Sequence, residues 1–221
     1  ENGVLEHLKD PKNKNTARVY SMIEDRKDNL WFATKEGLVV LDKKINTFKK
    51  YTIEDGLPSN FVRVLFRDSR GILWIGTDDG GLCELIEGKD NVSFKIYQND
   101  PDKLNTLSNN TVLSIHQDTY GYLWIGTFGG GLNKFDLNKE KFTVFTEKDG
   151  LSNNVIYGIL PDGEGNIWLS TNKGISYFNL KTKEIKNFDE TDGLQSNEFN
   201  SGAFFRSPSG QLFFGGVNGF N

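Results

Sequence analysis

One ten-residue stretch, DSRGILWIGT at residues 68–77, recurs along the chain and decides its fold. Nearly the same letters return as DTYGYLWIGT at residues 118–127, and looser copies stand at residues 25–34 and 162–171. The four tryptophans mark the register, and a fifth copy at residues 212–216 has Phe213 in place of the tryptophan. The steps between these marks are 43, 50, 44 and 45 residues. We therefore interpret the whole chain as an array of one repeated unit.

Each of the four units with a tryptophan also keeps an aspartate six residues before it and a glycine six residues after it, a register that chance does not produce. Since the aspartate and tryptophan recur together in these four units, we interpret them as structural. The aspartate is expected to accept backbone hydrogen bonds in a tight turn, and the indole to fill the space between neighbouring units. These positions are Asp25, Trp31, Asp68, Trp74, Asp118, Trp124, Asp162 and Trp168.

Four short apolar runs fill each unit and are joined by turns rich in Gly, Asn and Asp. Four strands about every 45 residues predict an all-β fold, a β-propeller of about five four-stranded antiparallel blades. A β-sandwich of about seven strands is the alternative, but it would not require the same motif in each repeat. The residue ten positions before each tryptophan, or before Phe213, is small, which predicts that the first strand of each unit lies innermost, where strands converge. These residues are Ser21, Val64, Ser114, Gly158 and Ala203.

The ends of the chain are out of phase with the blades, because LEHL at residues 5–8 matches FKIY at residues 94–97 in a fourth strand. We expect a single propeller segment over residues 1–221. Either it is part of a larger propeller array, which we favour, or residues 5–9 supply a missing outer strand and close a five-bladed ring. The expected parts are an outer strand of a preceding blade with its link over 1–16, blades over 17–59, 60–109, 110–153 and 154–196, and an incomplete blade over 197–221.

Composition excludes several classes of function for this segment. Lys and Arg number 26 against 30 Asp and Glu, a net charge of −4, so nucleic acid is not an expected partner. No stretch approaches the roughly 20 apolar residues of a membrane span. With two His, the single Cys83 and no His pair at ligand spacing, we expect no catalytic residue, no metal and no cofactor. Asp78 and Asp79 could contribute to a Ca²⁺ site, but we interpret them as solvated.

In a propeller, the loops from each outermost strand to the next innermost one, and from each second strand to the third, open on one face. That face is the expected ligand site. Asn amides suit sugar hydroxyls, and Phe128 or Tyr157 can stack on a sugar face. The asparagines have a structural alternative, since their recurrence before Trp74, Trp124 and Trp168 suits a loop cap. The candidate residues are Asn60, Asn110, Asn154 and Asn197 from the first set of loops and Asp79, Phe128, Lys173 and Asn218 from the second.

Positions where the repeat is not kept point to the ligand more directly. Eleven residues before each tryptophan, or its substitute, the side chains differ in chemistry, as an asymmetric pocket would need. We expect Arg63 and Tyr157 to contribute to binding, although Arg63 could equally satisfy a neighbouring loop carbonyl. The five residues are Tyr20, Arg63, Leu113, Tyr157 and Gly202.

The pattern DxxGxLWIGTxxGGL, at residues 68–82 and 118–132, closely resembles the two-component regulator propeller repeat. The links EDGLPSN at 54–60, KDGLSNN at 148–154 and TDGLQSN at 191–197 resemble the same family. The resemblance implies the periplasmic sensor half of a hybrid two-component system of Bacteroides-type bacteria, in which many members detect oligosaccharides and regulate polysaccharide-utilisation genes. Residues 197–220 resemble the last blade before a β-sandwich domain.

That resemblance implies a non-catalytic, ligand-receiving part of a larger receptor. The β-sandwich, a membrane helix and a histidine kinase would follow in the parent chain, which would act as a homodimer. Two alternatives stay open at this point. One is a streptogramin-lyase-like propeller enzyme, which should show a clustered His and Glu with a metal. The other is a free-standing lectin-like or protein-docking propeller, which requires the five-bladed ring to close.

Overall fold

The computed structural model describes residues 18–88 and 91–221, and these residues form five antiparallel sheets with the strands of each sheet in chain order. The first three sheets have four strands each. Their strands are β1 (Val19–Glu24), β2 (Leu30–Thr34), β3 (Gly37–Asp42), β4 (Thr47–Tyr51), β5 (Val62–Arg67), β6 (Leu73–Thr77), β7 (Leu82–Glu87), β8 (Val92–Tyr97), β9 (Val112–Gln117), β10 (Leu123–Thr127), β11 (Leu132–Asp136) and β12 (Lys141–Phe145).

The last two sheets repeat the arrangement, although the described part of the fifth has three strands. Their strands are β13 (Ile156–Pro161), β14 (Asn166–Thr171), β15 (Ile175–Asn179), β16 (Ile185–Phe188), β17 (Phe199–Arg206), β18 (Leu212–Gly216) and β19 (Gly219–Phe220). The prediction of an all-β propeller built from four-stranded antiparallel blades is confirmed.

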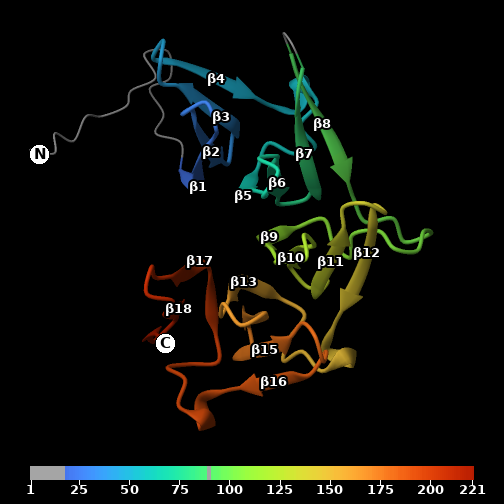
Figure 1. Cartoon of the computed structure of the whole chain (residues 1–221), viewed down its shortest axis with the longest axis vertical. Helices are drawn as coiled ribbons and strands as arrows, with labels where there is room; N and C mark the ends of the chain where they lie inside the picture. The colour runs from blue at the N-terminus through green and yellow to red at the C-terminus, as the bar shows by residue number, and fades with distance from the viewer. Residues whose placement is uncertain (1–17, 89–90) are drawn as a thin grey trace, which may run out of the picture.

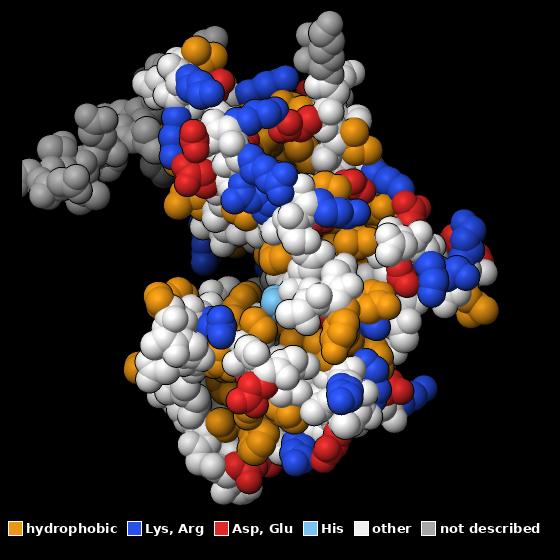
Figure 2. Space-filling model, in the orientation of Figure 1, with side chains coloured by type: hydrophobic (Ala, Val, Ile, Leu, Met, Phe, Trp, Pro, Cys, Tyr) orange, Lys and Arg blue, Asp and Glu red, His pale blue; other side chains and the backbone are white. Residues whose placement is uncertain are grey.

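The sheets follow one another around an arc, with the first strand of each blade innermost (Figure 1). The innermost strands β1, β5, β9, β13 and β17 pack against one another in this order. The strands β1 and β17 stand at the two ends of the arc, and the molecular surface is hollowed between those ends (Figure 2). Residues 5–9, which could add a strand to the fifth blade, lie outside the described residues. The same holds for the first expected segment, 1–16.

Small residues are needed where the two inner strands of a blade meet those of the next blade. A Cβ atom added to Gly126 would lie 2.4 Å from Oγ of Ser114 and 2.7 Å from the carbonyl oxygen of Ile156 in the following blade. One added to Gly76 would lie 2.6 Å from methyl groups of Val64 and Val112. Such distances are well inside van der Waals contact, so glycine is required at these two positions.

The core lies between the blades, in four clusters that each join two neighbours. Trp74, which is fully buried, packs with Val112, Ile115 and Leu123 of the third blade. The other tryptophans do the same at their own boundaries, but Trp168 is only half-buried against the described part of the fifth blade. The large indole thus supplies most of the apolar surface by which one blade adheres to the next.

The repeated aspartate closes the turn between the two inner strands. In the second blade, Asp68 accepts hydrogen bonds from the backbone N–H groups of Arg70 and Ile72 at 2.9 and 3.0 Å. Its other oxygen accepts from Nε1 of Trp74 at 3.2 Å. Burial alone would raise the pKa of Asp68, but the hydrogen bonds from Arg70, Trp74 and Ile72 outweigh it and hold that pKa below its usual value.

Candidate ligand-binding face

Two sets of loops meet on one face of the propeller, as the fold requires. The Asp78 N–H donates to the carbonyl oxygen of Phe61 at 3.0 Å, and the Phe128 N–H donates to that of Thr111 at the same distance. These bonds connect the loop from second to third strand with the segment that leads into the innermost strand. Other bonds cross to the next blade, as from Gly131 N–H to the carbonyl oxygen of Asn154 at 2.8 Å. The face is therefore a continuous, hydrogen-bonded rim.

The rim is built on short 3-10 turns that follow the fourth strands. They are η1 (Ile53–Asp55), η2 (Glu147–Asp149) and η3 (Glu190–Asp192). A Thr or Asp side chain caps the start of each turn, and an Asp at the third position returns a hydrogen bond to the cap residue. A glycine with φ near +100° ends each turn, at Gly56, Gly150 and Gly193.

The four recurring asparagines hold these loops together. In every case Oδ1 accepts a hydrogen bond from a backbone N–H group, and every side chain is half-buried. The donors are Ile53 for Asn60 at 2.9 Å, Asn99 for Asn110 at 2.7 Å, Glu147 for Asn154 at 2.9 Å and Glu190 for Asn197 at 3.0 Å. These contacts support the loop-capping alternative that the repeat pattern had raised, since the acceptor oxygens already serve the backbone.

The second set of candidates lies on the tips of the other loops. Phe128 is 53% exposed, and Asp79, Lys173 and Asn218 are also exposed. The backbone N–H of Asn218 donates to Oε1 of Gln195 at 2.8 Å, which fixes the last of these loops. Their side chains project from the rim where a ligand could reach them.

The non-repeating positions form the most organised group on the face. Arg63 makes an ion pair through Nε with Oδ1 of Asp78, and its guanidinium lies 4.5 Å from the ring centre of Phe61. The ring of Tyr20 is 4.9 Å from that of Phe61. Lys35 places its ammonium 5.6 Å from the same Phe61 ring. We call Tyr20, Lys35, Phe61, Arg63 and Asp78 the Phe61 cluster.

The Phe61 cluster combines aromatic surface, cations and one carboxylate in a partly exposed setting. Arg63 and Asp78 retain 25% and 33% side-chain exposure, so both remain open to solvent and to a ligand. Because Asp78 takes only Nε, the terminal guanidinium nitrogens of Arg63 can still donate. A neutral ligand with several hydroxyl groups would find both donors and acceptors here.

Tyr157 forms a second, separate group on the fourth blade. Its hydroxyl donates to Oδ1 of Asn172 at 2.8 Å. Partial burial raises the pKa of Tyr157, and the hydrogen bond to Asn172 opposes that shift only in part. Of the other two variable positions, Leu113 is buried and Gly202 has φ of +76°. Three of the five positions therefore present polar or aromatic groups to the face.

Sequence reasoning missed Phe61, Lys35 and Asn172 as candidates and placed Asp78 only in a possible Ca²⁺ site. The sequence did contain a signal for Phe61, because the equivalent residues of the third, fourth and fifth blades differ from it and from one another. They are Thr111, Val155 and Glu198. In the structure, the Asp78 carboxylate forms an ion pair with Arg63. Over residues 18–88 and 91–221, no three His, Cys, Asp or Glu side chains group as a metal site would need.

Comparisons with known proteins agree with the repeat pattern. The family model for the two component regulator propeller matches residues 13–36, 56–79, 106–129 and 150–173. The chain is similar to Histidine kinase P4 of Formosa agariphila, with 31% identity over 208 residues, which are 91% of this chain and 15% of the kinase.

Solved structures extend the comparison. The extracellular domain of one putative hybrid two component system from B. thetaiotaomicron is 27% identical with a TM-score of 0.78, over 92% of this chain and 29% of that one. Another from the same organism is 23% identical with a TM-score of 0.81, over 93% and 28%. The chain thus spans less than a third of each of these relatives. Among the described residues, none of the helices has the length and apolar character that crossing a membrane requires.

Proposed function

This chain is a run of two component regulator propeller repeats, and we propose that it is a non-catalytic ligand-sensing segment of a hybrid two-component system. In this proposal the segment lies in the periplasm as part of the ectodomain of an inner-membrane receptor. Further blades and a β-sandwich domain accompany it in the parent chain, which works as a homodimer. The ligand is an oligosaccharide, and the response is transcription of polysaccharide-utilisation genes.

The Phe61 cluster is the observation that carries the proposal. It lies on the loop face, at positions where the repeat is not kept, and it combines rings, cations and a carboxylate within a few ångströms. Oligosaccharides are bound by such mixtures of aromatic surface and hydrogen-bonding groups. Solvent-exposed Phe128 adds apolar surface elsewhere on the same rim.

Signalling would follow from a population shift. A ligand that binds one arrangement of the receptor dimer better than the other biases the dimer toward that arrangement by its difference in binding free energy. The segment need not change its own fold for this purpose. It needs only to present a face whose affinity for the ligand depends on the arrangement of the neighbouring parts of the receptor.

A thermal-shift screen of the intact ectodomain against a panel of oligosaccharides tests the ligand class. A ligand at 100 times its Kd stabilises the native state by about 2.7 kcal/mol, so a true ligand should raise the Tm by a few degrees. A panel that includes neutral, acidic and branched glycans and produces no rise would contradict the oligosaccharide proposal.

The encoded chain beyond Asn221 tests the receptor assignment separately. We expect a β-sandwich, a membrane helix and a histidine kinase there. A stop codon directly after Asn221 would contradict the two-component assignment, and a glycan response in such a protein would instead favour a free-standing lectin-like propeller.

A further inference from the structure

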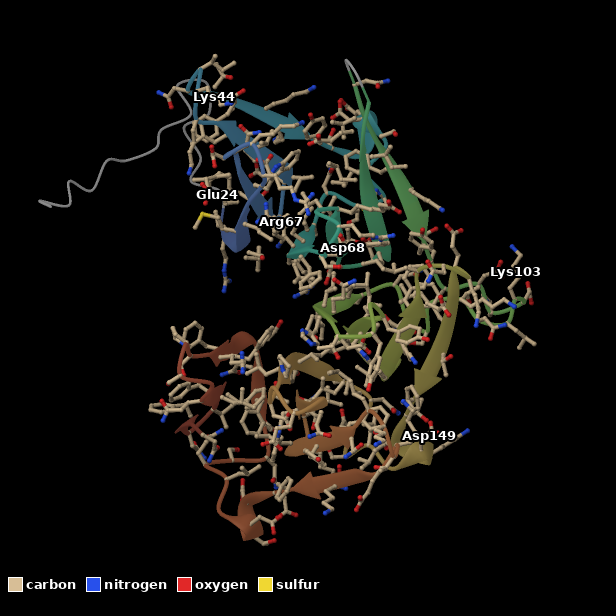
Figure 3. All side chains as sticks on the ribbon, in the orientation of Figure 1. Glu24, Lys44, Arg67, Asp68, Lys103 and Asp149 are labelled. Atoms are coloured by element: carbon tan, nitrogen blue, oxygen red, sulfur yellow. The ribbon has the colours of Figure 1, made fainter. Side chains whose placement is uncertain are left out.

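A second hollow lies on the opposite face of the propeller, between the turns of the first and second blades. It is a cavity of about 280 Å³ whose apolar wall includes Trp31 and Leu85. Three arginines line it, namely Arg26 from the turn after β1, Arg67 from the end of β5 and Arg70 from the next turn. In Figure 3, Arg67 lies between Glu24 of the first blade and Asp68 of the second.

The carboxylates at this boundary are already engaged. Glu24 pairs with Lys43 at 2.5 Å, and Glu87 pairs with Lys27. Asp25 accepts hydrogen bonds from Trp31 and from its own turn, and Asp68 pairs with Arg70 at 2.7 Å. Glu24, Glu87 and Asp68 therefore each have a cationic partner, whereas the Asp25 carboxylate is held by neutral donors in its own turn.

Two guanidinium groups at this boundary form no ion pair with a described carboxylate. Arg26 donates to the carbonyl oxygen of Ser69 at 3.2 Å, a neutral acceptor. Arg67 is half-buried, and among residues 18–88 and 91–221 no carboxylate forms an ion pair with it. A partly desolvated cation gains most from a negatively charged partner.

The next blade boundary shows how the same position is filled without excess charge. Gln117 corresponds to Arg67, because each pairs with the first residue of the adjoining strand, Leu123 or Leu73. Gln117 accepts from the Ser69 N–H at 2.7 Å and donates to the Gly121 carbonyl oxygen at 3.2 Å, so it bridges the two turns. At the first boundary a guanidinium replaces this neutral bridge and a cavity is present.

We propose that this cavity is an anion-binding site that takes the carboxylate or sulfate group of a small ligand, held by Arg67 and Arg26. A guanidinium is suited to this, since its planar donors match the two oxygens of such a group. At about 280 Å³ the cavity is slightly smaller than the roughly 300–1,000 Å³ typical of small-ligand sites, which favours a ligand of one or two rings. The site is on the face opposite the Phe61 cluster, so either proposal can fail without the other.

Calorimetric titration of the intact ectodomain at constant ionic strength tests the site. The probes are sodium glucuronate and sodium sulfate, with glucose and sodium chloride as the matched neutral and anionic controls. Arg67→Gln is the decisive variant, because it installs the residue that the third blade carries at this position and should preserve the fold. Lys44→Gln, in the β3–β4 turn, is the control, because it removes the same charge from an exposed site of the neighbouring first blade.

We expect glucuronate, sulfate or both to bind the unaltered protein and the Lys44→Gln variant equally well. Arg67→Gln should weaken that binding about tenfold or more, as the loss of a charge-assisted pair predicts. Its Tm without ligand should stay the same or rise, since an uncompensated cation has been removed. Binding that is absent for both oxyanions, or equal in Arg67→Gln, would overturn the proposal.

Discussion

The indole Nε1 of Trp124 donates a hydrogen bond to Oδ2 of Asp118, six residues earlier, at 2.8 Å. The first blade repeats this bond between Trp31 and Asp25, also at 2.8 Å. One carboxylate therefore closes the turn between the two inner strands and orients the indole that fills the space between blades. The fourth blade departs from this rule: Oδ2 of Asp162 accepts from Nδ2 of Asn166 at 2.7 Å, and the described structure has no bond between Asp162 and the indole of Trp168.

The departure predicts unequal effects of the same substitution in two blades. Trp124→Phe removes fully buried volume and the bond to Asp118, and should lower the free energy of unfolding by about 2–3 kcal/mol. Trp168→Phe should lower it by about 1 kcal/mol, because Trp168 is half-buried and has no hydrogen bond to Asp162 to lose. Urea unfolding midpoints measure both, and equal losses would contradict the part assigned to the Trp–Asp bond.

Acid should destabilise the propeller through the turn aspartates. Burial works to raise the pKa of Asp25 and Asp68, but hydrogen bonds from the tryptophan and turn groups outweigh it, so both pKa values lie below the usual one. A lowered folded-state pKa gives stability that is present above about pH 4 and is lost as the pH falls further.

Asp68→Asn isolates this effect. At pH 7 the variant should be less stable by about 1–3 kcal/mol, because the amide cannot accept from both Trp74 and Arg70 as the carboxylate does. Its Tm should then fall less than that of the unaltered protein between pH 5 and pH 3. Parallel losses in the two proteins would show that other groups carry the acid sensitivity.

The contact at Gly126 predicts a steric penalty with a partial rescue. Gly126→Ser should lower the free energy of unfolding by about 1–3 kcal/mol, because its Cβ meets Ser114 and the Ile156 carbonyl oxygen. The fourth blade uses the reverse pair, Gly158 opposite Ser170. Adding Ser114→Gly should therefore restore part of the loss in a chemical unfolding curve, and no restoration would contradict the pairwise account.

The capping asparagines can be separated from ligand contacts by stability alone. Asn154→Ala removes the acceptor for the Glu147 N–H and should lower the unfolding free energy by about 1 kcal/mol. Asn218→Ala, at an exposed loop tip, should change it by less than about 0.5 kcal/mol. Thermal unfolding of the two variants provides the comparison, and a stable Asn154→Ala protein would return Asn154 to the ligand candidates.

The repeat made the architecture predictable, because identical residues at a fixed period demand identical packing. The place of Trp74 between blades, and the need for small residues such as Ser114 on the innermost strands, followed from the spacing alone. The same regularity could not reveal which of the residues that differ between repeats contact one another. Phe61 and Tyr20 lie 41 positions apart in different blades, and their contact depends on how the two sheets are placed.

The candidate site was accordingly predicted only in part. Variation within the repeat pointed to Arg63, but its partner Asp78 and the ring of Phe61 emerge only when the loop folds back on the inner strand. The asparagines left two roles open. Their recurrence suited a loop-capping role as well as a shared ligand-facing one, and hydrogen-bond geometry at Asn60 and its equivalents supports capping.

Calorimetric titration of the oligosaccharide found in the thermal-shift screen, on the intact ectodomain, tests the central claim most directly. Arg63→Ala should weaken binding at least tenfold while the Tm without ligand changes little, because the Arg63–Asp78 pair is partly exposed. Lys134→Ala is the matched control, since Lys134 stacks on Tyr122 in the third blade, 3.5 Å from its ring centre. Full affinity in Lys134→Ala with loss in Arg63→Ala is the predicted result. Unchanged affinity in Arg63→Ala, or no oligosaccharide binding at all, would contradict a ligand site at the Phe61 cluster.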